Sequence, residues 1–192
     1  MKLAYIILSV ICVSLFVACV ILNNQFKSRV GKTMKLESAS FKNNEAIPAE
    51  FTAQGHNISP QLSWNGQPNK THSFVIIVDD PDAPSAKNPG PKPFVHWVVF
   101  NLPHNIHKLD QAAVIHTLGQ DAKEGNNDNG HKGYTGPKPP LNSGPHRYHF
   151  KVYALDKMLE LHVGATKEQV ETAMKHHILT QGELIGTYEI KS

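Results

Sequence analysis

Cysteine is almost absent from this chain of 192 residues, which contains only Cys12 and Cys19. Everything after residue 19 has none, so disulfides, thiolate metal sites and a cysteine nucleophile are excluded from that part. The chain also lacks a Gly-x-Ser-x-Gly elbow, a His-Glu-x-x-His motif and a phosphate-binding P-loop. The common signatures of hydrolases and nucleotide-binding enzymes are therefore missing.

A basic surface for nucleic acid is missing too, although the formal net charge is +3. Five of the 19 basic residues lie in the first 35 residues, with no acid among them. The remaining 14 basic residues are set against 16 acidic ones, which gives that part a formal charge of −2. We therefore expect no nucleic-acid partner.

The longest hydrophobic run spans residues 3–22, which is about the length a helix needs to cross a bilayer. It predicts one N-terminal hydrophobic helix that is either an uncleaved signal anchor or a signal peptide cut near Ala18 or Cys19. Positive charges lie on both sides, so the positive-inside rule does not decide the orientation. We expect a cell-envelope protein that is exported (periplasmic or extracellular) or anchored in the membrane through this segment.

The chain then divides into three parts. Residues 1–22 are the signal peptide or signal anchor, residues 23–35 a basic polar tether, and residues 36–192 a single domain.

Runs of β-branched residues and alternating apolar and polar residues predict that this domain is mainly β. Strands are predicted over residues 74–78, 94–102, 147–155 and 184–190. One helix is predicted from the capping box of Thr166 and Gln169, with apolar residues at helical spacing as far as Ile178. His177 belongs to that helical face in this interpretation.

Polar residues gather where the predicted strands begin and end. Asp79-Asp80-Pro81-Asp82 closes one strand, His96-Trp97 lies within the next, and His146-Arg147-Tyr148 opens a third after a Gly- and Pro-rich stretch. Taken singly, these are explained as a turn, a core histidine and a polar rim. Together, a carboxylate beside an imidazole favours the imidazolium, which suits a phosphate or carboxylate ligand when a Tyr hydroxyl lies nearby. Backbone N–H groups of the Gly- and Pro-rich loop could approach the same anion.

These stretches resemble the signature motifs of the phosphatidylethanolamine-binding protein family. The signature segments are residues 78–84, 96–101 and 144–148. Further segments are similar to the bacterial Raf kinase inhibitor-like (YbhB/YbcL-type) branch, namely residues 47–48, 59–64, 127–128, 153–156 and 182–188. The match runs in the family's order from about residue 35 to the C-terminus.

The resemblance implies an antiparallel β-sandwich with small peripheral helices and a cavity that binds phosphate-like groups at one end. Carried over by motif, the ligand-binding residues are Asp80, Asp82, His96, Pro139, Pro140, His146 and Tyr148. Arg147 and Trp97 would give structural support. The resemblance implies neither a metal ion nor a cofactor.

Three departures from the family pattern favour a small anion over a phospholipid head group. Ala53-Gln54 stands where bacterial members often carry Cys-Asp, and Asn129 replaces an expected aromatic residue. The C-terminal helical extension of eukaryotic members is missing, since little follows Tyr188.

The leading hypothesis is therefore non-catalytic binding of a small anion or phospholipid head group, with a regulatory or inhibitory role toward an envelope protein partner. One alternative is a hydrolytic or metal-dependent enzyme that uses Asp80, His96 and His146. Another is an interaction scaffold with a vestigial cavity.

Overall fold

The computed structural model describes residues 33–192. The hydrophobic helix predicted within residues 1–22 and most of the predicted tether lie outside the described residues. In the described part, no helix is both long and apolar enough to cross a membrane. Met34 is already buried and the first strand begins at Lys35, so the folded domain starts slightly before residue 36.

A six-stranded sheet forms the centre of the domain, in the order β2-β9-β8-β4-β5-β7. Neighbouring strands are antiparallel except β2 and β9, which pair in parallel. The strands are β2 (Glu45–Ala46), β4 (Ser73–Asp80), β5 (Phe94–Pro103), β7 (Lys123–Glu124), β8 (His146–Leu155) and β9 (Ile178–Tyr188).

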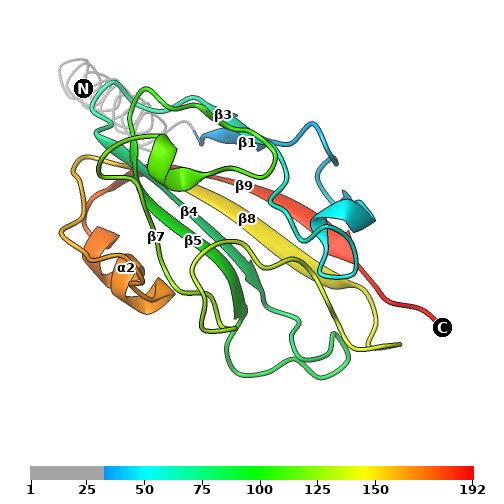
Figure 1. Ribbon diagram of the computed structural model, residues 1–192. Coiled ribbons are helices and arrows are strands. Elements are labelled where there is room, and N and C mark those ends of the chain that lie inside the picture. The colour runs from blue at the N-terminus through cyan, green and yellow to red at the C-terminus, as the bar shows by residue number, and fades with distance from the viewer. Residues whose placement is uncertain (1–32) are drawn as a thin grey trace, which may run out of the picture. The chain divides into compact units, whose positions relative to one another are not determined.

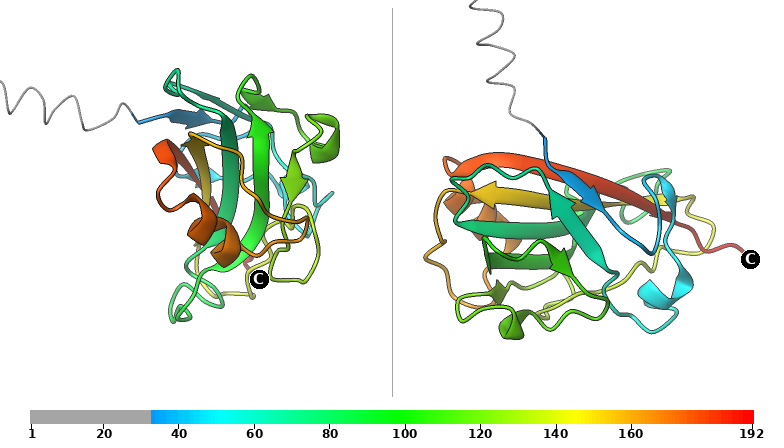
Figure 2. Two further views of the ribbon diagram at one scale, coloured as in Figure 1. Left: turned by 90° about the vertical axis from the view of Figure 1, so that its left-hand side faces the viewer. Right: turned by 90° about the horizontal axis from the view of Figure 1, so that it is seen from above.

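A three-stranded sheet covers one face of this large sheet (Figure 2). It consists of β1 (Lys35–Glu37), β3 (Leu62–Asn65) and β6 (Lys108–Leu109), in the order β1-β3-β6. Side chains that alternate along β4 and β8, such as Ile76 and Phe150, are fully buried against Leu62 and Trp64 of the smaller sheet. Two packed sheets therefore share one core, as expected for a mainly β domain.

The opposite face of β4 and β5 packs against the helix α2 (Lys167–Met174) (Figures 1 and 2). Val75 and Ile77 of β4 belong to a second apolar cluster with Val170 and Met174 of the helix. Because β4 is covered on both faces, its sequence reads as a continuous apolar run rather than an alternating one. In the described part, α2 is the single α-helix, beside the 3-10 turns η1 (Ala49–Phe51) and η2 (Ile115–Thr117).

The predicted capping box of Thr166 and Gln169 is confirmed, but the helix is shorter than its pattern indicated. It ends at Met174, and Ile178 already begins β9, where it pairs with Leu155. His177 therefore lies in the turn between them, with Nδ1 2.8 Å from Oδ1 of Asp156. Long-range pairing with β8 overrides the local helical spacing of this segment.

Candidate functional site

The polar motifs meet around one pocket of about 640 Å³ at the end of the large sheet. Asp80 ends β4, His146 begins β8, and His96 lies near the start of β5. Because β5 and β8 both run antiparallel to β4, their first residues lie beside the last residues of β4. The topology therefore brings together three segments that are far apart in the sequence.

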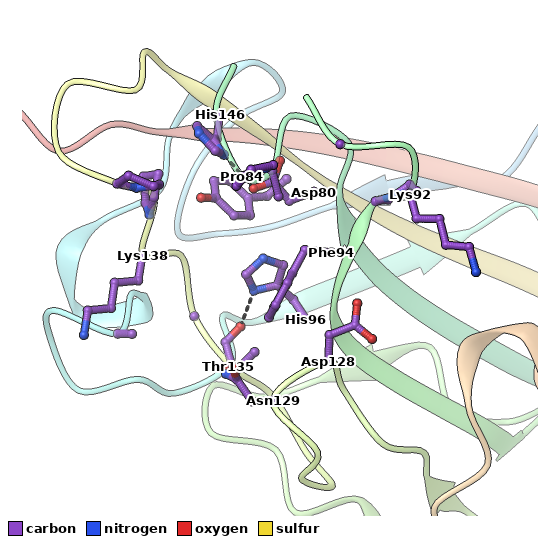
Figure 3. Close-up of a pocket in the computed structure, with 18 of the residues that line it drawn as sticks. Asp80, Pro84, Lys92, Phe94, His96, Asp128, Asn129, Thr135, Lys138 and His146 are labelled. Atoms are coloured by element: carbon purple, nitrogen blue, oxygen red, sulfur yellow. Dashed lines mark hydrogen bonds and ion pairs between the residues drawn. The ribbon is translucent and has the colours of Figure 1, made fainter. Parts of the chain in front are cut away.

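Asp80 and His146 form a buried pair at the back of the pocket (Figure 3). Asp80 Oδ2 lies 2.7 Å from His146 Nδ1, and Asp80 Oδ1 accepts a hydrogen bond from the backbone N–H of Asp82 at 2.8 Å. The other ring nitrogen of His146, Nε2, lies 3.0 Å from the hydroxyl of Ser143. Both nitrogens of His146 therefore already have protein partners. No sequence motif had pointed to Ser143.

His96 differs from His146 because only one of its nitrogens has a partner. Its Nδ1 lies 2.7 Å from the backbone oxygen of Thr135, as Figure 3 shows. Within residues 33–192, Nε2 makes no hydrogen bond, yet it is not enclosed by protein and the ring lines the pocket. Burial lowers the pKa of His96, although the Thr135 carbonyl and the nearby charge of Asp80 act in the opposite direction.

Tyr148 lies between the two histidines. Its ring centroid is 5.1 Å from that of His96 and 6.5 Å from that of His146. Burial, followed by the charge of Asp80, raises the pKa of Tyr148, so the hydroxyl stays protonated. The structure gives this hydroxyl no hydrogen-bond partner among the described residues, and it lies in a pocket-lining side chain.

The loop over residues 137–140 contributes a single backbone donor. Pro137, Pro139 and Pro140 have no N–H, so Lys138 alone supplies one, and this group is unpaired within residues 33–192. The N–H of Gly136, by contrast, donates to Asn57 Oδ1 at 2.7 Å. Lys138, Pro139 and Pro140 all line the pocket.

Asp82 does not line the pocket, although the motif placed it there. Its carboxylate accepts hydrogen bonds from the backbone N–H, Nε and Nη2 of Arg147, at 2.9, 2.9 and 2.8 Å. These hydrogen bonds lower the pKa of Asp82. Arg147 thus ties the Asp-Pro-Asp turn to β8.

Asp128, which sequence reasoning missed, is the second carboxylate of the pocket lining. Its Oδ2 accepts a hydrogen bond from the backbone N–H of Val95 at 2.8 Å. Asn129, the residue that replaces an expected aromatic side chain, also lines the pocket and donates from Nδ2 to Thr135 Oγ1 at 3.0 Å.

Trp97 lies in the core, away from the pocket lining. Its Nε1 donates to Glu124 Oε1 at 3.0 Å, and its ring packs edge-on against Tyr134.

The pocket wall is otherwise apolar, with charge at its rim. Phe94 and several alanine and proline residues line it: Ala53, Ala83, Pro84, Pro91 and Pro93. Lys92 and Lys138 are exposed, and their side chains extend away from the centre in Figure 3. Across residues 33–192, no group of three or more His, Cys, Asp or Glu side chains is arranged to hold a metal ion.

Comparisons with known proteins identify the family. The family described as "Phosphatidylethanolamine-binding protein" matches residues 37–189. A UPF0098 protein of Methanothermobacter thermautotrophicus is 44% identical over 156 residues, which cover 81% of this chain and 98% of that protein.

Solved structures agree with this match. Escherichia coli YbcL is similar with a TM-score of 0.75 and 30% identity, over 83% of this chain and 100% of that one. A phosphatidylethanolamine-binding protein homologue from Chlamydia trachomatis is similar with a TM-score of 0.73 and 40% identity, over 82% and 97% of the two chains. The chain therefore belongs to the phosphatidylethanolamine-binding protein family, in its bacterial and archaeal UPF0098/YbcL-like branch.

Proposed function

We propose that this protein binds a small phosphate-type anion in the pocket without turning it over. The observation that carries the proposal is that three polar groups around one pocket lack partners in the described domain: Tyr148 hydroxyl, Lys138 N–H and His96 Nε2. Tyr148 and His96 are buried, whereas Lys138 is exposed. Buried polar groups are almost always hydrogen-bonded, so the two unpaired groups of Tyr148 and His96 at one pocket favour a polar ligand, to which the Lys138 N–H can add a donor.

The charges around the pocket support a small ligand rather than a densely charged one. Lys92 and Lys138 at the rim attract an anion, while Asp80 and Asp128 oppose a high negative charge inside. The apolar wall, which includes Phe94 and Pro84, favours a ligand with a short organic group beside its phosphate. A simple phosphate monoester, including a phospholipid head group, meets these conditions.

Isothermal titration calorimetry of the full-length chain with inorganic phosphate and phosphoryl-ethanolamine tests the proposal. We expect saturable binding of at least one of them, and at least tenfold weaker binding by Tyr148→Phe, since that change removes one donor and little else. Absence of saturable binding to the wild-type protein would refute the anion site.

A hydrolytic enzyme is the second candidate, because one observation favours it. Ser143, His146 and Asp80 are joined in the hydrogen-bond order of a nucleophile, a general base and an orienting carboxylate. Ser143 is buried, however, and is not among the residues that line the pocket. Non-catalytic binding therefore remains the proposal.

The biological role that we propose is regulatory or inhibitory, toward an envelope protein partner. It rests on the predicted signal peptide or anchor over residues 3–22, which would place the domain outside the cytosol or at the membrane. Comparing partners captured from the cell envelope by wild-type protein and by Tyr148→Phe tests it. Partners that are lost with the variant would depend on the pocket, whereas partners that are kept would indicate a scaffold that acts through its surface.

A further inference from the structure

Given the proposed anion site, we infer that the pocket selects a phosphate monoester that carries one proton, whose P–O–H group donates a hydrogen bond to Nε2 of His96. The protein partners of the polar groups in the pocket fix which of these groups can donate and which can accept a hydrogen bond from the anion.

The tautomer of His96 follows from its contact with Thr135. A backbone carbonyl oxygen can only accept, so Nδ1, at 2.7 Å from it, must carry a hydrogen. In the neutral ring the other nitrogen, Nε2, is then an acceptor with a lone pair. His96 Nε2 therefore needs a donor from the ligand, unless the ring takes up a proton.

The surroundings of His96 decide between these two states. Carboxylates act on it from β4 (Asp79 and Asp80) and from the loop after β7 (Asp128), and each of them favours the charged ring. The rings of Tyr148 on β8 and Phe94 on β5 pack against it, at 5.1 and 4.9 Å between centroids. Because burial outweighs the carboxylates, the pKa of His96 is lowered, and near neutral pH the ring is an acceptor.

His146 cannot substitute for His96 in this role. Its Nδ1 faces the Asp80 carboxylate and its Nε2 faces the Ser143 hydroxyl, so neither nitrogen is left for a ligand. Asp80 cannot supply a hydrogen either, because its two oxygens face His146 and the N–H of Asp82.

Apart from the exposed side chains of Lys92, Asp128 and Lys138, the pocket therefore offers two unpaired donors, Tyr148 Oη–H and Lys138 N–H, and one unpaired acceptor, His96 Nε2. A singly protonated phosphate monoester presents the complementary set of acceptor oxygens and one O–H. A sulfate ester of the same shape and charge presents only acceptors. A site built to bind a hydroxyl discriminates strongly against an analogue without it, because the buried acceptor is then left unpaired.

Methyl phosphate and methyl sulfate form a matched ligand pair for the test. At about pH 6, near the second pKa of a phosphate monoester, much of the methyl phosphate is a monoanion like methyl sulfate and differs from it by the O–H. Calorimetry on the full-length chain should give at least about tenfold tighter binding of methyl phosphate. Measured in two buffers with different ionisation enthalpies, binding of methyl sulfate should take up a proton on His96, whereas binding of methyl phosphate should take up only the smaller fraction that converts its dianion into the monoanion.

His96→Asn is the decisive variant. Its side-chain amide can keep a donor toward the Thr135 carbonyl while Nε2 is removed, so we expect a folded protein that has lost the preference for methyl phosphate. Tyr148→Phe is the matched control and should weaken both ligands by a similar factor. If His96→Asn fails to fold, the difference in proton uptake between the two esters in the wild-type protein still tests whether His96 accepts a hydrogen bond from the phosphate.

The outcomes separate the two proposals. Equal affinity of the wild-type protein for both esters, with the same proton uptake, would overturn the inference and leave the anion site intact. Binding of neither ester, nor of inorganic phosphate or phosphoryl-ethanolamine, would overturn the proposed function itself.

Discussion

Asp79 and Asp80 are neighbours at the end of β4, yet their side chains lie on opposite faces of the sheet and in different surroundings. Asp79 lies on the side of α2, where Lys151 Nζ is 2.8 Å and Lys167 Nζ 2.6 Å from its oxygens. Asp80 lies on the other face and lines the pocket. Both carboxylates are almost completely buried.

The difference lies in how completely each region is paired. Burial alone would raise the pKa of Asp79, but the hydrogen bonds and charges of Lys151 and Lys167 lower it by more. Around Asp80, by contrast, Tyr148 Oη and His96 Nε2 lack partners in the described domain. The fully paired ion cluster of Asp79, Lys151 and Lys167 holds the helix to the sheet. The unpaired groups of Tyr148 and His96 are instead available to bind a ligand in the pocket. Mutations on the two sides should therefore separate stability from binding.

The largest expected effect is on the stability side, in Asp79→Asn. Removing the charge leaves two ammonium groups without their shared carboxylate, so we expect the free energy of unfolding to fall by about 3 kcal/mol. Urea denaturation measures this loss, and anion affinity should be unchanged. Lys151→Met is the control and should cost less, because Asp79 keeps Lys167 as a partner. A loss below about 1 kcal/mol for Asp79→Asn would contradict the importance of the cluster.

Two tyrosines sharpen the comparison on the pocket side. Tyr148→Phe should weaken anion binding about tenfold, yet change the free energy of unfolding by less than about 0.5 kcal/mol, because no protein group bonds its hydroxyl in residues 33–192. Tyr134→Phe is the matched control, since the Tyr134 hydroxyl donates to the backbone oxygen of Phe51 at 2.9 Å. It should lose about 1 kcal/mol of stability and keep its anion affinity. The reverse pattern would contradict this assignment.

As the pH falls, the contribution of His96 to the free energy of unfolding should be lost before that of Asp79. A histidine whose folded-state pKa is lowered binds fewer protons than the unfolded chain, so its contribution to stability is present above the unfolded pKa of about 6.5 and is lost as pH falls below it. The loss amounts to at most about 1.4 kcal/mol per pH unit.

The buried carboxylates with lowered pKa values, Asp79 and Asp82, lose their contributions only below about pH 4. Denaturation at several pH values should therefore show a first decline between about pH 6.5 and 5 that His96→Asn reduces. An unchanged decline in that variant would assign it to other groups.

The fold and most of the pocket could be predicted from the sequence because their signals are local. The strand patterns placed Asp80, His96, His146 and Tyr148 at or near strand ends, the family resemblance assigned them to one cavity, and in the structure all four line one pocket. The family was recognised for the same reason, since its motifs are short stretches at those ends.

The residues that were misplaced or missed depend on long-range contacts. Asp82 follows the end of β4, where strand alternation no longer fixes direction, and Arg147, 65 residues later, turns it from the pocket. Asp128 is placed by its bond to the backbone of Val95. The start of β9 depends on pairing with β8, which helical spacing within residues 170–178 does not reveal.

The smallest expected effect concerns Ser143. It tests whether the pocket that Asp80 lines only binds its ligand or also catalyses a reaction. Its hydroxyl lies 3.0 Å from His146 Nε2, but the residue is buried and absent from the pocket lining, so an electrophile in the pocket should not reach it. We expect a fluorophosphonate probe to leave Ser143 unlabelled, as measured by intact-mass and peptide analysis. The control is the half-buried Ser85, whose hydroxyl donates to the Ser143 carbonyl oxygen at 3.3 Å and which should also stay unlabelled. Ser143→Ala should cost about 1 kcal/mol of stability, because it removes the partner of His146 Nε2. Labelling of Ser143 that disappears in His146→Ala would instead establish an activated nucleophile and move the protein from binding to catalysis.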